Sequence, residues 1–245
     1  MTRRPPCARG CAGYDTRVMG KLAASILAAD LAHLGDQVKL VERYAEVFHV
    51  DIMDGHFVPP IALGTVVVKS LRPVTERTLH GHLMVDAPEA YFDELREAGL
   101  DRVSFHLEAV PDPGPAIRKA RDAGLGVGLT LNLETSLEAA TPYLEEIDDL
   151  MLMSIRPGWS FQQLNPEVYP RLAAARAQID RRNPAVDLEI DGGVKVENAA
   201  RAIDAGANVL VAASGVFAQP DPAAAARALA EIAADEPARP TGKVH

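Results

Sequence analysis

Cysteine is almost missing from this chain of 245 residues, because Cys7 and Cys11 are its only two cysteines. A disulfide framework is therefore excluded as the basis of the fold, and a cytoplasmic, reducing environment is the expected one. The spacing of the two cysteines resembles half of a metal site. No second Cys or His pair follows nearby, so we interpret both residues as incidental.

Long apolar runs and an excess of basic charge are also missing. No stretch of about 18 apolar residues is present, and the first residues lack the apolar segment that a secretory signal requires. We therefore expect no membrane partner. With 25 Lys and Arg against 34 Asp and Glu, the net charge is −9. This balance argues against nucleic acid as a partner, because a phosphate backbone needs a basic surface.

What the chain does contain is an eightfold repeat of a short apolar run, a turn and an amphipathic stretch. Hydrophobic residues make up 48% of the sequence, which is enough for a large core. The apolar runs predict strands at 21–27, 47–53, 78–85, 102–108, 126–132, 149–155, 187–191 and 209–217. The amphipathic stretches predict helices at 31–44, 65–71, 88–98, 115–123, 136–144, 166–180, 196–205 and 222–233.

Alternation of strands and helices favours parallel strands with right-handed crossovers. Eight such units in one uninterrupted stretch predict an α/β protein, a single-domain (β/α)8 TIM barrel. An open doubly wound sheet is the alternative, but its glycine fingerprint is missing, because residues 25–30 (SILAAD) contain no glycine. We expect a disordered N-terminal extension over 1–20, the barrel over 21–234 and a flexible tail over 235–245.

Polar residues stand at the expected carboxyl ends of three strands, where barrels carry their active sites. Side chains alternate along a strand, so one inward face carries His49, Asp51, His80, His82, Glu189 and Asp191. Buried carboxylates and imidazoles are costly unless they are paired or bind a metal. Two His and two Asp from three strands form a set that suits Zn²⁺ or another first-row divalent ion.

Glycines follow the last two expected strands. Gly192 and Gly193 end the seventh strand, and Ser214 and Gly215 interrupt the eighth. Glycines allow backbone N–H groups to approach an anion, and phosphates commonly bind at this position in such barrels. The pattern indicates a phosphate-binding site beside the metal-binding residues.

Five motifs together resemble the ribulose-phosphate 3-epimerase family. They are SILAAD at 25–30, HVDIMDGHFVP at 49–59, HLM at 82–84, MS followed by PG within 153–158, and EIDGG at 189–193. The resemblance runs in order from residue 21 to residue 233. It implies a metal-dependent epimerase that inverts C3 of a ketose phosphate, converting D-ribulose 5-phosphate to D-xylulose 5-phosphate by two-base proton transfer through an enediolate.

The resemblance also implies roles for individual residues. The metal ligands would be His49, Asp51, His82 and Asp191, and the catalytic acid–base pair would be Asp51 and Asp191. The residues that bind substrate would be Ser25, Met53, Met84, Met153, Gly158, Gly192, Gly193 and Ser214. The cofactor would be one divalent metal ion, Zn²⁺ first, with Fe²⁺, Mn²⁺ or Co²⁺ as alternatives. The partner would be a small sugar phosphate of the pentose phosphate pathway, and we expect a homo-oligomer.

Departures from the family pattern concentrate near the phosphate end. After Gly158 the family usually has FGGQ, whereas this chain has WSFQ at 159–162, and Arg156 replaces the usual Asn. His80 replaces an Asp. Two alternatives stay open: D-allulose-6-phosphate 3-epimerase, toward which Phe48 and the run 214–217 lean, and a non-catalytic paralogue that binds a sugar phosphate. His106 and Glu108 also face inward, either supporting the metal ligands or forming an ordinary polar layer.

Overall fold

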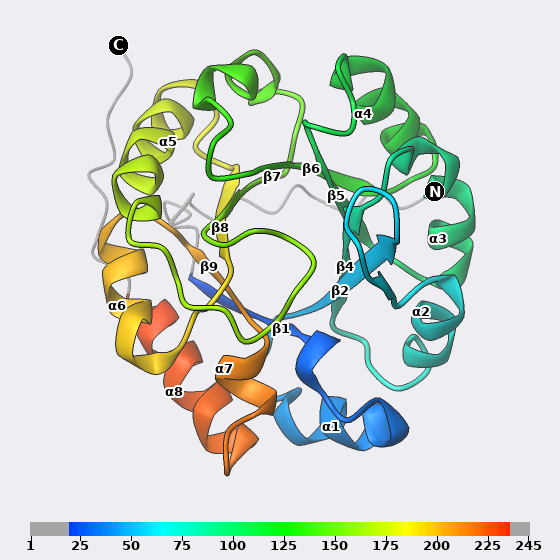
Figure 1. Ribbon diagram of the computed structural model, residues 1–245, viewed down its shortest axis with the longest axis vertical. Helices are drawn as coiled ribbons and strands as arrows, with labels where there is room; N and C mark the ends of the chain where they lie inside the picture. Colours follow the sequence, from blue (N-terminus) through cyan, green and yellow to red (C-terminus); the bar gives the residue numbers. More distant parts are fainter. Residues whose placement is uncertain (1–19, 236–245) are drawn as a thin grey trace, which may run out of the picture.

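Eight parallel strands surround one axis in the computed structural model, which describes residues 20–235 (Figure 1). The strands are β1 Lys21–Ser25, β2 Val47–Asp54, β4 Thr78–Met84, β5 Arg102–His106, β6 Gly126–Leu131, β7 Asp149–Met153, β8 Asp187–Asp191 and β9 Val209–Ala212. Each pairs with its neighbours in the order β1-β9-β8-β7-β6-β5-β4-β2, and β1 also pairs with β2. This last pairing closes the sheet, so the predicted (β/α)8 barrel is confirmed.

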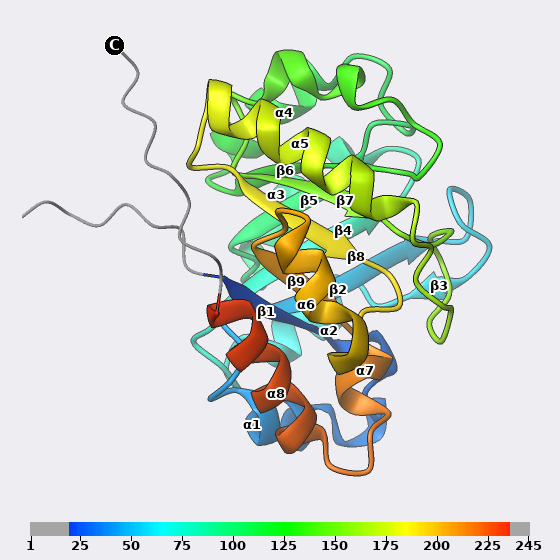
Figure 2. The ribbon, with the colours of Figure 1, turned by 90° about the vertical axis from the view of Figure 1, so that its left-hand side faces the viewer.

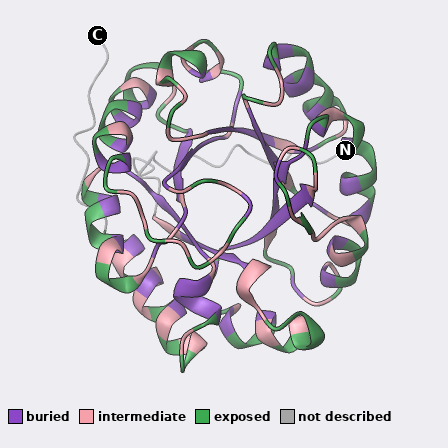
Figure 3. Ribbon diagram, viewed as in Figure 1, coloured by how far each residue is buried: buried purple, intermediate pink, exposed green. Residues whose placement is uncertain are grey.

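Helices form the outer ring of the barrel, as Figures 1 and 2 show. They are α1 Leu34–Val41, α2 Thr65–Leu71, α3 Phe92–Ala98, α4 Pro113–Asp122, α5 Val168–Arg182, α6 Val196–Asp204, α7 Ser214–Phe217 and α8 Pro222–Ala234. In Figure 3 the strands are buried, whereas the helices are exposed on their outer surfaces. None of the helices within 20–235 is long and apolar enough to cross a membrane.

Alternation along the strands separates two environments. On β2, Phe48, Val50 and Ile52 face outward and join the apolar core between strands and helices. The inward positions hold little apolar material, and a separate small cluster is formed by Ala23, Val47, Val209 and Val211. Several other inward positions hold buried polar side chains, among them His49, His80 and Ser104, so ionisable groups lie inside the barrel.

The expected eighth strand, 209–217, is wrong in its second half. β9 ends at Ala212, and the short helix α7 begins at Ser214. The pairing of β9 with β8 ends at Val211 and its pairing with β1 ends at Ala212. Beyond that point no neighbouring strand remains to pair with, so the chain turns away from the sheet.

The expected helix at 136–144 is also wrong. Two 3-10 turns, Leu137–Ala139 and Thr141–Tyr143, take its place. Pro142 has no N–H to donate to the preceding turn, so a continuous α-helix cannot pass through it. The other expected helices are present, although 31–44 and 88–98 begin with 3-10 turns, Leu31–His33 and Pro88–Ala90.

A short strand that the sequence did not predict, β3 Ile61–Ala62, pairs antiparallel with the end of β2. The turn between them is held by Asp54, whose Oδ1 accepts hydrogen bonds from the backbone N–H groups of His56 at 2.8 Å and Phe57 at 2.9 Å. This hairpin brings residues 54–62 back to the carboxyl end of the barrel.

Both expected tails lie almost entirely outside the described residues. Cys7 and Cys11 lie outside the described residues, and only Gly20 and Asp235 of the two expected tails are described. The boundaries 1–20, 21–234 and 235–245 therefore stay predictions.

Gly128 on β6 generates the first testable prediction. A Cβ at this position would overlap the Asp149 carboxylate and the Ser104 hydroxyl inside the barrel. We expect Gly128→Ala to lower the free energy of unfolding by about 2 kcal/mol or more, because overpacking of a filled interior is destabilising. Urea denaturation measures the effect.

The matched control is Gly35→Ala on α1, where a Cβ would make only ordinary contacts with Val74. We expect this change to leave stability unchanged or to raise it by up to about 1 kcal/mol, because Ala favours a helix over Gly. Equal losses from both substitutions would contradict the packing of the interior described above.

Candidate active site

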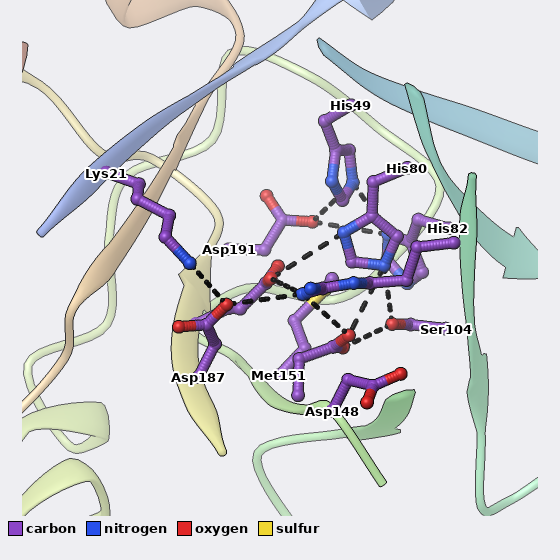
Figure 4. A network of polar contacts seen from close by, with 12 residues as sticks. Lys21, His49, His80, His82, Ser104, Asp148, Met151, Asp187 and Asp191 are labelled. Atoms are coloured by element: carbon purple, nitrogen blue, oxygen red, sulfur yellow. Dashed lines mark hydrogen bonds and ion pairs between the residues drawn. The ribbon is translucent and has the colours of Figure 1, made fainter. Parts of the chain in front are cut away.

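Two imidazoles and two carboxylates meet at the carboxyl end of the barrel. β2 contributes His49 and Asp51, β4 contributes His82, and β8 contributes Asp191. His49 Nε2 lies 3.3 Å from His82 Nδ1, 3.6 Å from Asp51 Oδ1 and 3.9 Å from Asp191 Oδ2. His82 Nδ1 lies 3.6 Å from Asp51 Oδ1 and 3.4 Å from Asp191 Oδ2. Figure 4 shows His49, His82 and Asp191 from close by.

These distances fit a shared cation. In a tetrahedral Zn²⁺ site with bonds of about 2.1 Å, neighbouring ligand atoms lie about 3.4 Å apart. The five distances given above range from 3.3 to 3.9 Å, and one ligand atom from each residue lies within 4.8 Å of the others. The donor set combines imidazole nitrogens and carboxylate oxygens, which suits a divalent first-row ion. The four residues can therefore hold a metal.

The electrostatics of the cluster also demand a positive charge. Burial raises the pKa of the Asp51 carboxyl, but attraction from His49 and His82 outweighs burial and holds this pKa well below its usual range. Burial lowers the pKa of His82, but its contacts with Asp191 and Asp51 outweigh burial and raise the pKa to about 9. The two carboxylates thus stabilise a cation between them, either a proton on His82 or a metal ion.

Ser25 lies at the end of β1 and contacts the same cluster. Its hydroxyl donates a 2.6 Å hydrogen bond to Asp51 Oδ2 and accepts one from the Leu27 backbone N–H at 3.3 Å. Ser25 is buried, with 2% of its surface exposed. The structure therefore gives Ser25 a definite task, which is to hold one oxygen of Asp51 while the other faces the imidazoles.

A second polar layer lies deeper in the barrel. His80 Nε2 lies 2.6 Å from the Ser104 hydroxyl, which in turn donates to Asp149 Oδ2 at 2.5 Å. Arg102 lies 3.3 Å from Asp149 and 4.0 Å from Glu189. Burial raises the pKa of Glu189 well above its ordinary value, and repulsion from Asp149 adds to this rise.

His49, His80 and Glu189 also approach one another within 4.8 Å. This group suits a metal less well than the upper cluster, because the Arg102 guanidinium already supplies a positive charge beside Glu189. Burial and the charge of Arg102 hold the pKa of His80 well below its usual value. The deeper layer is therefore a structural network. Ser104 and Asp149 were not predicted from the sequence, although alternation along β5 and β7 could have placed them inside.

The residues expected to bind substrate gather around one pocket above the metal-binding cluster. Its wall includes Ser25, Asp51, Met53, Met84, Met153, Gly158, Asp191, Gly192, Gly193 and Ser214. His49 and His82 are fully buried beneath it. Three methionines of this wall are almost completely buried, so the pocket has an apolar side beside its two carboxylates. The structure thus brings all of the predicted site residues together.

The loop that departs from the family pattern forms part of the same wall. Trp159, Ser160 and Phe161 line the pocket, and Gln162 ties the loop by donating to the backbone oxygens of Arg156 at 2.8 Å and Trp159 at 2.9 Å. Phe161 has a φ of +67°, a left-handed conformation that glycine adopts more easily. A bulky residue therefore occupies a position that favours glycine, which restricts the conformations open to this loop.

Phe48, in contrast, does not reach the pocket. It is fully buried in the apolar core outside the strands. Its presence before the metal-binding motif therefore carries no information on the length of the sugar. The run 214–217 forms α7, of which only Ser214 lines the pocket.

The raised pKa of His82 generates a prediction for the protein after treatment with a chelator. A histidine whose folded pKa of about 9 exceeds its ordinary value of 6.5 stabilises the fold below pH 6.5 and loses that contribution as the pH rises through 9. We expect the free energy of unfolding of metal-free protein to fall across this interval.

His82→Asn should flatten this pH dependence, whereas His56→Asn, at an exposed position, should leave it in place. Urea denaturation at pH 6, 7.5 and 9 measures the slopes. A wild-type slope in His82→Asn would contradict the electrostatic description of the cluster.

Comparison with known proteins agrees with this geometry. The family model described as "Ribulose-phosphate 3 epimerase family" matches residues 21–217. The ribulose-phosphate 3-epimerase of Bacillus subtilis is 38% identical over 205 residues, which cover 83% of this chain and 94% of that protein. The enzyme of the same name from Synechocystis is 40% identical over 203 residues, which cover 82% of this chain and 88% of that protein.

Solved structures show the same fold at lower sequence identity. KGPDC from Streptococcus mutans aligns with a TM-score of 0.66 at 16% identity, covering 88% of this chain and 97% of that chain. The 3-hexulose-6-phosphate synthase from Salmonella typhimurium aligns with a TM-score of 0.63 at 17% identity, covering 87% and 98%. These two similarities support the barrel alone, whereas the family match and the sequence relatives identify the lineage. The chain therefore belongs to the ribulose-phosphate 3-epimerase family and is an epimerase.

Proposed function

We propose that this epimerase inverts C3 of a ketose phosphate and converts D-ribulose 5-phosphate to D-xylulose 5-phosphate. The observation that carries the proposal is the approach of two carboxylates to one pocket floor from different strands. Asp51 comes from β2 and Asp191 from β8, and β1 and β9 lie between these strands in the barrel. Two bases placed apart can exchange a proton with two faces of one carbon, as inversion requires.

The fit described above supports one divalent cation held by His49, Asp51, His82 and Asp191. When bound, such an ion stabilises negative charge on the substrate oxygens next to the reacting carbon. Zn²⁺ is the first candidate, and Fe²⁺, Mn²⁺ and Co²⁺ share the same ligand preferences.

In the proposed reaction one aspartate removes the C3 proton to give an enediolate, and the other delivers a proton from the opposite face. Two carboxylates serve this purpose because a single base tends to return the proton to its original side. Ser25 keeps one oxygen of Asp51 engaged in a 2.6 Å hydrogen bond, which orients the other oxygen. Orientation of this kind raises the rate because the reacting groups need no rearrangement.

The pocket wall supports the remaining roles. Met53, Met84 and Met153 form an apolar side that limits water around the reacting carbon. Gly192 and Gly193 have φ values of +114° and +64°, in the left-handed region that favours glycine. We assign the phosphate group to this edge of the pocket, between Gly192, Gly193, Ser214 and the loop at Gly158.

Ribulose 5-phosphate is the substrate that the comparisons favour, because the curated relatives named above are ribulose-phosphate 3-epimerases. Phe48 no longer supports a longer sugar, since it lies in the outer core. Because the chain belongs to the ribulose-phosphate 3-epimerase family, we also assign it to the pentose phosphate pathway and to the cytoplasm. We also propose assembly into a homo-oligomer, because barrels of this kind often associate.

The first test of the proposal is Asp191→Asn. We expect exchange of the C3 hydrogen with solvent to slow by at least about 100-fold, because one of the two proton-transfer groups is lost. NMR in D₂O measures the exchange on D-ribulose 5-phosphate, with the metal content of each protein determined in parallel. Asp204→Asn, at an exposed position on α6, serves as the matched control. Exchange at the wild-type rate in metal-loaded Asp191→Asn would remove Asp191 from the acid–base role.

The second test is a substrate panel. We expect kcat/KM for D-ribulose 5-phosphate to exceed that for D-allulose 6-phosphate by roughly tenfold or more, and that for unphosphorylated D-ribulose by at least about 100-fold, because remote binding of the phosphate lowers the barrier. A preference for allulose 6-phosphate would favour the longer sugar. Metal binding without turnover of any ketose phosphate would favour a non-catalytic role.

A further inference from the structure

A chain of three side chains leads from the metal-binding cluster into the barrel wall. His82 Nε2 lies 2.9 Å from His106 Nε2, and His106 Nδ1 lies 3.3 Å from Glu108 Oε2. The rings of His82 and His106 have centroids 5.0 Å apart and planes that differ by 21°. This is the arrangement of two nearly coplanar imidazoles joined edge to edge by one hydrogen bond. Both histidines are fully buried.

Glu108, at the end of this series of side chains away from the metal-binding cluster, is held by two further donors. Glu108 Oε1 accepts a 2.8 Å hydrogen bond from the Asn132 backbone N–H and a further bond from the Thr135 hydroxyl. Burial raises the pKa of Glu108, but the contacts with His106, Thr135 and Asn132 outweigh it and lower the pKa to about 2. Glu108 is therefore an ionised acceptor, and the nitrogen that faces it must carry a hydrogen.

The ionised Glu108 then determines which ring nitrogens of His106 and His82 carry hydrogens. His106 donates from Nδ1 to Glu108. A neutral imidazole has one ring hydrogen, so with that hydrogen on Nδ1 the Nε2 of His106 is an acceptor. His82 must donate from Nε2, because two acceptors cannot share a 2.9 Å contact. When His82 carries this hydrogen alone, its lone pair lies on Nδ1, the atom that faces Asp51, Asp191 and His49.

We propose that His106 and Glu108 are positioning residues that fix the hydrogen of His82 on Nε2 and so direct its Nδ1 lone pair toward the cation. The inference rests on the proposed metal site and deepens it, because it names what sets the ligand atom of one of its histidines. A carboxylate that acts through an imidazole also makes the ligand more basic. Phe57, whose ring centroid lies 4.8 Å from that of His106, covers the chain on one side.

Glu108→Gln is a sharp test because the structure predicts which way the new amide points. The Asn132 N–H needs an acceptor at the Oε1 position, so the amide oxygen stays there and the NH₂ group faces His106. His106 Nδ1 must then accept, its Nε2 must donate, and His82 must accept at Nε2. The hydrogen of His82 moves to Nδ1, where it opposes the metal.

We expect Glu108→Gln to weaken binding of Co²⁺ to the full-length, chelator-treated protein by roughly 10- to 100-fold. The Co²⁺ absorption bands provide the readout, independently of epimerase activity. Glu134→Gln makes the same charge change at an exposed position between Asn132 and Thr135, and it should bind Co²⁺ as the wild type does. Glu108→Gln with wild-type Co²⁺ affinity would overturn the proposal.

A second readout needs no metal and separates this inference from the proposed metal site. Nitrogen-15 NMR of metal-free protein at about pH 10, above the pKa of about 9 at which His82 loses its second ring hydrogen, should show His106 protonated at Nδ1 in the wild type and at Nε2 in Glu108→Gln. Protonation at Nδ1 in both proteins would overturn the inference even if the wild type binds metal. If the wild type binds no Co²⁺, the metal site fails, while the NMR result still decides the tautomer.

Replacement of His106 covers the case in which Glu108→Gln does not fold. His106→Leu removes the acceptor for His82 Nε2, whereas His106→Gln retains an amide oxygen at that end. We expect roughly tenfold weaker Co²⁺ binding in His106→Leu, with partial recovery in His106→Gln. Equal affinities in both variants would contradict a role for His106 as the acceptor.

Discussion

The mutual repulsion of Asp51 and Asp191, relieved only by a shared positive charge, is the constraint on which the rest of this site depends. Ligand atoms of two carboxylates and two imidazoles lie within 4.8 Å of one another in a largely buried place. Such an arrangement is costly without a cation and favourable with one. The raised pKa of His82 and the lowered pKa of Asp51 are two expressions of the same demand. The barrel strands hold these groups in place, so the demand is built into the fold.

Most of this site could be predicted because a strand has a period of two. Alternation placed His49 and Asp51 on the inward face of β2 and sent Phe48 and Val50 outward, as the structure has them. The barrel itself followed from eight strand–helix units. What alternation cannot show is which atoms touch. The hydrogen bond from Ser25 to Asp51 and the contact of His82 with His106 depend on the register between neighbouring strands, β1 with β2 and β4 with β5.

The errors arose where a local pattern met a constraint from elsewhere in the chain. The apolar run 209–217 continues past Ala212, but β8 and β1 offer no further pairing there. The stretch 136–144 has helical periodicity, but Pro142 interrupts it. The hairpin at Ile61–Ala62 depends on Asp54 capping its turn. Periodicity predicts that an element exists, whereas pairing partners and single residues decide where it ends.

Polar layers of the barrel interior have different tasks. The upper layer faces the pocket and holds the proposed metal ligands, whereas Arg102, Asp149 and Glu189 form ion pairs below it.

The most direct test of the proposed metal site is anomalous diffraction at the zinc edge from crystals of Zn²⁺-loaded protein. One peak should lie about 2.0–2.2 Å from His49 Nε2, His82 Nδ1 and one oxygen each of Asp51 and Asp191. A peak between His80 and Glu189, or none in the barrel, would contradict it.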